Sequence, residues 1–400
     1  MNETKGFCMK RLARNTAKSL VICLYRIMNG ILPVKDNRIV FSSSLGKSYS
    51  GNPKALYKRL VSDGLDSKYE CIWFYESTPY DIEGKHIQVR YRGLKYLFYM
   101  ATAKIWIFDA RQPEFLRKKS RVVYIQTWHG TPLKKLGLDI DNMFMAGETG
   151  IEAYHESFRR NSSTWDYLIS QNPFSTQVFR RAFDFKGKML ETGYPRNDIL
   201  FEFNTEEHIA DLKRSLGLPA DKKIMLYAPT WRDDEGAGIG SYHYSNALDI
   251  DMMKDAFEDE AVLIIKYHYL VKDDINWSDY KDFVYIFDQS VDIAGLYLVS
   301  DMLITDYSSV MFDYSLLKKP MYFYCYDLEH YKNVLRGFYF DFENSSPGPL
   351  SVTTEELIED IRAERSKDYE EAYRDFCQMY DPWDDGNASH KVLSEVLDNA

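Results

Sequence analysis

The segment "MLITDYSSVMFDYSLLKKP", residues 302–320, contains the pattern that decides the fold. An apolar run ends at Asp306, Ser308 and Ser309 follow, and apolar residues then recur at helical spacing. A second apolar run, residues 320–327, begins where the helical pattern ends. Strand, polar loop, helix and strand in this order predict a parallel β-sheet in which the helix is the crossover connection.

The same alternation extends in both directions along the chain. Residues 36–205 and residues 206–375 each contain strand-like runs separated by amphipathic helical stretches, and the polar stretch 201–223 lies between the two blocks. We therefore expect two doubly wound α/β domains that face each other across a cleft. The segment 376–400 is expected to be helical and to pack back on the N-terminal domain. The expected strands are 37–44, 69–77, 86–91, 103–109, 121–128 and the starts of 165–183 and 188–198, then 223–231, 261–269, 283–288, 301–309 and 320–327.

The composition is that of a globular protein with ample material for buried cores. Of the 400 residues, 45% are hydrophobic and 28% are charged. A net charge of −10 argues against a general nucleic-acid binder, which normally carries a basic domain. The five cysteines are widely separated and include no Cys-x-x-Cys pair. This usage indicates a reducing compartment, with neither a disulfide framework nor a zinc site.

Residues 1–35 differ from the rest of the chain in charge. Their apolar residues fall on one helical face, which predicts a basic amphipathic helix on an anionic membrane surface. No uncharged apolar run reaches about eighteen residues, so no segment is expected to span a bilayer, and Arg26 interrupts the stretch that a signal peptide would need. A helix docked on the body is the alternative. Both interpretations imply a cytoplasmic location, and membrane contact would place the protein peripherally on the cytoplasmic face of the cell membrane. The stretch contains one acidic residue, Glu3, and the basic residues Lys5, Lys10, Arg11, Arg14, Lys18 and Arg26.

The polar residues at the end of the 301–309 strand are candidates for binding a phosphate group. In an open parallel sheet, ligands gather beyond the carboxyl ends of the strands. A helix that begins near Ser308 offers unpaired backbone N–H groups, to which Ser308 and Ser309 add hydroxyl donors. Asp306 would repel a phosphate at close range, so we expect it to cap the helix, position a hydroxyl or contact the nucleoside. A turn in which these side chains only cap the helix is the alternative.

Two histidines end strands in different domains. His129 ends the run "YIQTWH", where it can accept a proton near neutral pH, and Gly130 permits a substrate to approach closely. His268 ends a strand of the second domain and can bind a phosphate oxygen. Thr230 and Arg232 follow another strand of that domain, where the arginine can hold a phosphate bidentately or pair with the neighbouring aspartates. No carboxylate cluster has metal-ligand spacing, so no metal site is expected.

Together these stretches resemble the CDP-glycerol glycerophosphotransferase family of teichoic acid and capsule synthesis. The resemblance implies a GT-B-type fold with two Rossmann-like domains. It also implies transfer of a polyol phosphate from a CDP-activated donor to a hydroxyl of a lipid-linked acceptor, with release of CMP. The matching stretches are "TWHGTPLKKLG", "TGYPRNDIL", "YAPTWRDD", "IKYHY", "ITDYSSVMFDYSLLKKPMYFYCYD", "RGFYFDF" and "DGNASHKV".

The resemblance also assigns roles to individual residues. It implies that His129 is the general base that deprotonates the acceptor hydroxyl. The chain departs from the family at Tyr269, where relatives often have a proline after the histidine, and this leaves the local loop shape open. The implied contacts to the donor pyrophosphate are His268, Ser308 and Ser309, with Asp306 close by and Thr230 and Arg232 as further donor-side candidates. His268 is counted with His129 as catalytic, and Gly130 is a substrate-binding candidate.

Alternative functions share parts of this interpretation. CDP-ribitol in place of CDP-glycerol keeps the fold and the mechanism. A glycosyltransferase that uses a nucleotide sugar would release a nucleoside diphosphate instead of CMP. A membrane-bound scaffold with a decayed site is a third alternative, which the joint presence of His129, His268, Ser308 and Ser309 opposes. No cofactor is required by the sequence. The sequence leaves three questions open. They are whether the pyrophosphate brings a magnesium ion, what the oligomeric state is, and whether the enzyme adds one unit or polymerises.

Overall fold

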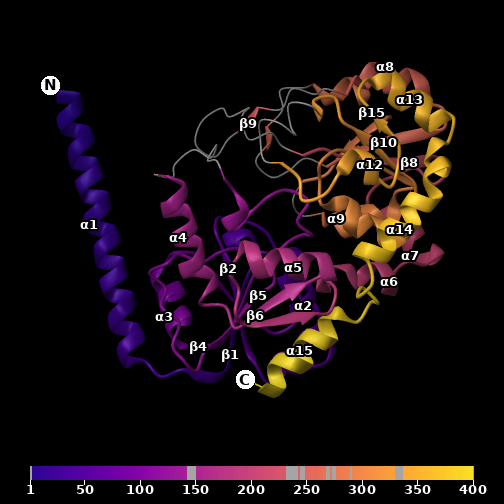
Figure 1. Cartoon of the computed structure of the whole chain (residues 1–400). Helices are drawn as coiled ribbons and strands as arrows, with labels where there is room; N and C mark the ends of the chain where they lie inside the picture. The colour runs from indigo at the N-terminus through magenta and orange to yellow at the C-terminus, as the bar shows by residue number, and fades with distance from the viewer. Residues whose placement is uncertain are drawn as a thin grey trace.

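Two lobes, each built around a parallel β-sheet, make up the molecule (Figure 1). The computed structural model describes residues 2–141, 150–230, 242–243, 248–266, 271–272, 276–288, 291–328 and 337–399. The first lobe carries the indigo and magenta elements of Figure 1, and the second carries most of the orange ones.

The first lobe contains a seven-stranded sheet in the order β3-β2-β1-β4-β5-β6-β7, and all its neighbouring strands are parallel. Helices α1, α3, α4 and α5 contribute to the core on one face, and α2 contributes to the core on the other. The strands are β1 (Lys35–Ser42), β2 (Glu70–Tyr75), β3 (Ile87–Arg90), β4 (Ala103–Phe108), β5 (Val123–Gln126), β6 (Tyr167–Ser170) and β7 (Lys188–Glu191). The helices are α1 (Asn2–Ile31), α2 (Gly51–Ser62), α3 (Leu94–Thr102), α4 (Ile151–Ser162) and α5 (Pro173–Ala182).

The second lobe contains a six-stranded parallel sheet in the order β12-β10-β8-β13-β14-β15, and β9 (Tyr242–His243) pairs separately with β11 (Val271–Lys272). The sheet strands are β8 (Lys223–Ala228), β10 (Ala261–Ile265), β12 (Val284–Ile286), β13 (Met302–Thr305), β14 (Met321–Tyr324) and β15 (Leu350–Ser351). The helices from here to the end of the chain are α6 (Ile199–Glu202), α7 (Glu206–Ser215), α8 (Ile250–Phe257), α9 (Ile293–Val299), α10 (Val310–Tyr314), α12 (Phe342–Ser345), α13 (Thr354–Arg362), α14 (Glu370–Tyr380) and α15 (Ala388–Asn399).

The buried parts of the strands are mostly apolar because both faces of each sheet are covered. In β1, Val40 enters the core on one face of the sheet, and Ile39 and Phe41 enter the core on the other. In β10, Ile264 and Ile265 divide between two cores in the same way. Side chains on a strand alternate between faces, so a continuous apolar run is what a doubly covered parallel sheet requires. The predicted fold class, two Rossmann-like domains of GT-B type, is confirmed.

The differences from the expected elements lie mainly at strand ends. The sequence predicts a strand over 121–128, but β5 ends at Gln126. The chain leaves the sheet there because Trp128 adopts a left-handed backbone angle, φ = 53°, which a β-strand does not tolerate.

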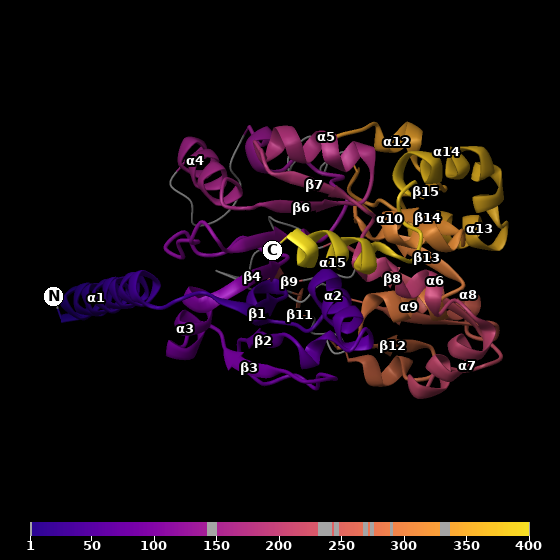
Figure 2. The ribbon, with the colours of Figure 1, turned by 90° about the horizontal axis from the view of Figure 1, so that it is seen from below.

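The C-terminal helix α15 lies on the first lobe, although α14 belongs to the second. Phe376 and Tyr380 of α14 are buried in the second lobe's core. Val392, Leu393 and Val396 of α15 are buried in the first lobe's core, in the same cluster as side chains of α2. Viewed from below, α15 lies across the first lobe beside α2 (Figure 2). The two lobes are therefore connected by the chain twice, before α7 and after α14.

Helix α1 extends away from the body over most of its length, as both views show (Figures 1 and 2). Its C-terminal part is attached to the first lobe. The hydroxyl of Tyr25 donates to the carbonyl oxygen of Arg117 over 2.9 Å, and its ring lies 5.9 Å from that of Phe115. Within the described ranges, no helix has the length and apolar character needed to cross a bilayer.

Candidate active site

A cavity of about 870 Å³ lies between the lobes, and loops of both lobes line it. The first lobe contributes loops that follow β4 and β5, including His129 and Gly130. The second contributes Thr230 after β8, and Ser308 and Ser309 after β13. These are carboxyl ends of parallel strands, where α/β sheets bind their ligands. The structure thus brings five of the predicted site residues to one cavity.

His129 is held by its neighbours in one orientation. Its Nδ1 lies 3.0 Å from the carbonyl oxygen of Asp109, and its ring stacks on that of Trp128 with centroids 4.5 Å apart. A carbonyl oxygen only accepts hydrogen bonds, so Nδ1 carries the proton and Nε2 is left with a lone pair. The side chain is exposed to the cavity. Nε2 is therefore available to accept a proton from a bound hydroxyl.

The surroundings keep this imidazole neutral. Desolvation by the enclosing protein lowers the pKa of His129 below its ordinary value of 6.5, and the positive charge of Arg196 lowers it further. The bond to Asp109 opposes both effects without reversing them. A neutral imidazole is the form that a general base requires.

The carboxyl group of Asp109 lies behind the histidine and is itself buried. Its Oδ1 accepts from the backbone N–H of Ser44 over 2.8 Å. Burial raises the pKa of Asp109 to about 7, although the hydrogen bond from Ser44 lowers it in part. Asp109 therefore fixes the start of the loop that positions His129.

Gly130 marks a point where the two lobes approach each other closely. A Cβ atom at this position would lie 2.8 Å from Oγ of Ser309 and 3.3 Å from its Cβ. Any larger residue would force the strand-end loop of the first lobe away from the start of α10 in the second. The glycine is needed for this contact rather than for an unusual backbone angle.

The second-lobe residues differ in how they meet the cavity. Ser308 and Ser309 precede α10, and Oγ of Ser308 accepts weakly from the N–H of Val310 over 3.5 Å. Asp306 is 2% exposed, and its Oδ1 accepts from the backbone N–H of Thr230 over 2.9 Å. Asp306 is absent from the cavity lining and ties the ends of β13 and β8 together. Its observed role is thus to shape the loop that carries Thr230.

Two predicted site residues, Arg232 and His268, lie outside the described residues. Their donor-side roles stay predictions. The described ranges contain no group of three or more histidine, cysteine, aspartate or glutamate side chains placed to hold a metal ion.

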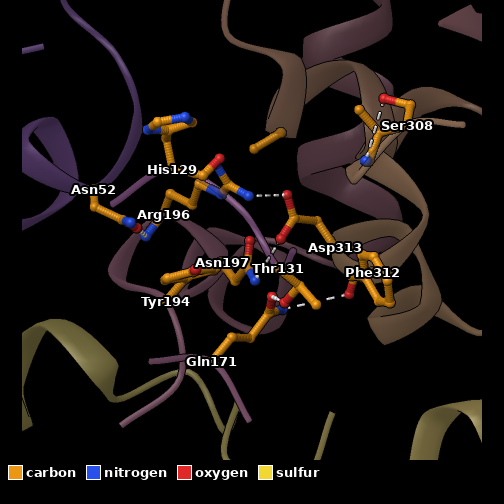
Figure 3. A network of polar contacts seen from close by, with 12 residues as sticks. Asn52, His129, Thr131, Gln171, Tyr194, Arg196, Asn197, Ser308, Phe312 and Asp313 are labelled. Atoms are coloured by element: carbon orange, nitrogen blue, oxygen red, sulfur yellow. Dashed lines mark hydrogen bonds and ion pairs between the residues drawn. The ribbon is translucent and has the colours of Figure 1, made fainter. Parts of the chain in front are cut away.

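An ion pair beneath His129 links the lobes, and sequence reasoning did not identify it (Figure 3). Nη1 of Arg196 donates to the carbonyl oxygen of His129 over 2.8 Å, and Nη2 donates to Oδ2 of Asp313 over 2.5 Å. Arg196 follows β7 in the first lobe, and Asp313 lies on α10 in the second. Nδ2 of Asn197 donates to Oδ1 of Asp313 over 3.1 Å, and Nδ2 of Asn52 donates to the Trp128 carbonyl over 3.2 Å. The loop that carries His129 and helix α10, which follows Ser308 and Ser309, therefore share one buried network.

A second set of polar contacts joins the lobes nearby. The hydroxyl of Thr131 donates to Oε1 of Gln171 over 2.6 Å, and Nε2 of Gln171 lies 3.4 Å from the carbonyl oxygen of Phe312 (Figure 3). Nδ2 of Asn172 donates to the carbonyl oxygen of Tyr380 over 2.9 Å. These buried side chains fix the lobes in the arrangement that forms the cavity.

Comparison with known proteins gives a consistent result over the whole chain. A profile of the family described as CDP-Glycerol:Poly(glycerophosphate) glycerophosphotransferase matches residues 24–398. A teichoic acid poly(glycerol phosphate) polymerase of Bacillus spizizenii is 43% identical over 95% of this chain and 98% of its own length. A teichoic acid glycerol-phosphate transferase of Staphylococcus aureus is 42% identical over 96% of this chain and 100% of its own length. The chain spans 51% of a longer poly(glycerol phosphate) polymerase from Bacillus subtilis.

The solved structures give the same result. The Wall Teichoic Acid Polymerase TagF superposes with a TM-score of 0.88 and 35% identity, over 98% of this chain and 96% of the other. A further structure of TagF, soaked with CDPG, superposes with a TM-score of 0.87.

Proposed function

This chain belongs to the CDP-glycerol:poly(glycerophosphate) glycerophosphotransferase family, and on that premise we propose its acceptor, its site roles and its location. It transfers glycerol phosphate from CDP-glycerol to a hydroxyl of a teichoic acid acceptor and releases CMP. The acceptor proposed for this chain is linked to a lipid at the cytoplasmic face of the membrane.

His129 is the proposed general base. Its Nε2 accepts the proton of the acceptor hydroxyl while the hydroxyl oxygen forms a bond to the β-phosphorus of CDP-glycerol. The bond between that phosphorus and the bridging oxygen breaks, and CMP leaves with the electron pair. The observation that carries this role is the free Nε2 of a neutral imidazole in a cavity that the other lobe lines with hydroxyl groups.

Ser308, Ser309 and Thr230 are the proposed donor contacts among the described residues. These residues lie on the second-lobe side of the cavity, opposite the loop of His129. Negative charge spreads over the phosphoryl oxygens as CMP leaves, and hydrogen-bond donors already in place stabilise it without reorganisation. Arg232 and His268 are proposed to complete this side.

CMP release from a panel of donors tests the reaction. The purified protein is incubated with a teichoic acid acceptor and with CDP-glycerol, CDP-ribitol or a nucleotide sugar in turn. We expect CMP only with the CDP donors and a faster rate with CDP-glycerol. A nucleoside diphosphate product, or a preference for CDP-ribitol, would contradict the proposal. Repeating the assay with EDTA and with added Mg²⁺ tests whether a magnesium ion assists the donor.

The exposed apolar residues of α1 support binding to a membrane surface. Leu20 is 66% exposed, Ile27 is 54% exposed and Ile31 is 73% exposed. Tyr25 on the same helix is buried against the first lobe, so the body holds one side of the helix while this apolar row stays in contact with solvent. Apolar rows flanked by basic residues bind the headgroup region of anionic membranes.

Co-sedimentation with vesicles tests this location. Leu20→Glu/Ile27→Glu is expected to abolish binding to vesicles that contain phosphatidylglycerol, because carboxylates oppose burial in an anionic interface. Met379→Glu is the matched control, since Met379 is 56% exposed on α14, far along the chain. Equal binding by the double variant, the control and the unchanged protein would refute the anchoring role.

A further inference from the structure

The connection from α14 to α15, residues 381–387, runs along the loop that follows β7 in the first lobe. Oδ1 of Asp384 accepts from the backbone N–H of Tyr194 over 3.0 Å and from Nδ2 of Asn197 over 3.2 Å. Gly193 has a left-handed backbone angle, φ = 79°, and a Cβ atom added there would lie 2.9 Å from the same oxygen. Asp384 therefore contacts both ends of one short segment of the first lobe.

This segment contains the arginine that holds the loop of His129. Nη1 of Arg196 donates to the carbonyl oxygen of His129 over 2.8 Å, and the backbone N–H of Arg196 donates to Oδ1 of Asn52 over 3.1 Å. Nδ2 of Asn52 in turn donates to the carbonyl oxygen of Trp128 over 3.2 Å. Figure 3 shows Arg196 between His129 and Asp313. A displacement of the segment would therefore disturb the contacts that hold the main chain next to the imidazole.

Asp384 and Asp313 accept hydrogen bonds from the same amide group. Nδ2 of Asn197 donates to Oδ1 of Asp384 over 3.2 Å and to Oδ1 of Asp313 over 3.1 Å. The positive charge nearby, Arg196, already forms an ion pair with Asp313. Two neighbouring carboxyl groups disfavour being ionised together. The ion pair with Arg196 therefore leaves the negative charge on Asp313 and favours a neutral Asp384.

The surroundings of Asp384 also favour its protonated form. Its Oδ2 is buried, and among the described residues no group lies in hydrogen-bond geometry with this oxygen. Burial raises the pKa of Asp384 to about 8, and the charge of Asp313 contributes to the increase. The N–H of Tyr194 and the amides of Asn197 and Gln171 oppose this increase without reversing it. The phenol of Tyr194, which also faces Asp384, has a raised pKa and stays neutral.

We propose that Asp384 is a positioning residue for the general base: its carboxyl group holds the segment 193–197 in place, and Arg196 transmits that placement to the carbonyl of His129. Asp384 is absent from the lining of the cavity, so it acts on the reaction through Arg196 and not by contact with a substrate. The connection between α14 and α15 thus contributes to catalysis from outside the cavity. This inference rests on the proposed role of His129 and adds a residue that orients it.

Three variants test the inference in the CMP-release assay with CDP-glycerol and a teichoic acid acceptor. Asp384→Ala should lower kcat by about 10- to 100-fold, because a misplaced base costs rate even when the change lies away from the chemistry. It should leave the KM for CDP-glycerol unchanged, because the proposed donor contacts come from the other lobe. Asp384→Asn should retain kcat near neutral pH, since its amide oxygen can accept the same two hydrogen bonds. Asp385→Asn is the matched control, because Asp385 is exposed and bonds to Asn387 and Lys391 on its own side of the connection.

The pH profile separates this role from a purely structural one. The raised pKa means that the folded protein favours the neutral carboxyl group, so its contacts persist below about pH 8 and weaken above it. The kcat of the unchanged protein should therefore fall as the pH rises through about 8. Asp384→Asn has no titratable group at this position, so its kcat should stay constant over the same range.

The possible outcomes separate this inference from the function on which it rests. Undiminished kcat in Asp384→Ala, equally slow turnover in Asp384→Asn, or the same alkaline decrease in Asp384→Asn and the unchanged protein would each overturn the inference. If circular dichroism shows that Asp384→Ala does not fold, the pH profiles of Asp384→Asn and the unchanged protein still decide it. Slow turnover of His129→Ala together with unchanged Asp384 variants would overturn this inference alone, whereas full turnover of His129→Ala would contradict the proposed function as well.

Discussion

His129 is oriented by a main-chain carbonyl, and this choice of partner sets its charge. A carboxylate at Nδ1 would favour the imidazolium and raise the pKa, whereas the Asp109 carbonyl fixes the tautomer without a full negative charge. The nearby Arg196 then lowers the pKa further. Trp128 holds a left-handed angle next to this histidine, and strain of this kind is typical of functional sites.

We expect the activity to persist into mildly acidic solution. The base must be neutral, and a lowered pKa keeps His129 neutral below pH 6.5, so kcat/KM should fall only at a pH lower than that value. His129→Ala should lower kcat by roughly two to four orders of magnitude, the usual effect of losing a positioned base. The pH profile and the turnover of the variant, measured by CMP release, check both statements. A decrease in kcat/KM that begins above pH 6.5, or unchanged turnover of His129→Ala, would show that His129 is not the general base.

Gly130→Ala tests the close approach of the lobes. The added Cβ would lie 2.8 Å from Oγ of Ser309, so the loop must shift, at a cost of about 1–3 kcal/mol. We expect kcat/KM to fall about tenfold or more while secondary structure measured by circular dichroism is retained. Gly295→Ala is the control, because Gly295 lies within α9 and its added Cβ would come no closer than 3.5 Å to Leu212. Unchanged kcat/KM in Gly130→Ala would show that the contact is not needed.

At the scale of elements, hydrophobic patterning predicted nearly every strand of the two sheets because both faces are buried. The apolar runs at 261–265 and 302–305 coincide with β10 and β13. Patterning did not predict where residues distant in the chain would meet. Arg196 and Asp313 both lie in stretches that carried the family resemblance, but their pairing spans 117 positions and no local pattern encodes it. Their proximity follows only from the packing of two separate sheets.

Leu393→Ala tests the contribution of α15 to the first lobe. Leu393 is 3% exposed in the core shared with α2. Truncation of a buried leucine should lower the free energy of unfolding by about 2–5 kcal/mol. Ser394→Ala, an exposed position on the same helix, should change it by less than about 0.5 kcal/mol. Urea denaturation compares the variants, and equal stabilities would mean that α15 contributes little to this core.

At the scale of the whole molecule, the cavity depends on how buried polar groups connect the lobes. The side chains of Arg196 and Asp313 are 19% and 5% exposed. Burial raises the pKa of Asp313, and the charge of Arg196 lowers it. The buried carboxylate of Asp313 therefore depends on Arg196 to keep its charge. This ion pair thus connects the contact between the lobes to the orientation of the His129 carbonyl.

A double-mutant cycle tests this connection. Asp313→Asn leaves a buried guanidinium without its counter-charge, which should cost about 3–5 kcal/mol of folding free energy. Arg196→Met should cost a similar amount, because it leaves the carboxylate unpaired. Replacing both together should cost much less than the sum of the two, and differential scanning calorimetry measures the difference. Additive losses would show that the two side chains act independently.

The position of α15 has a consequence for how the protein is made. Ribosomes deliver the chain from its first residue to its last, and domains generally fold in that order. Here α15, which follows the strands of the second lobe in the chain, completes the core of the lobe that was translated first. The first lobe therefore cannot complete this core on the ribosome until the strands of the second lobe have also been synthesised.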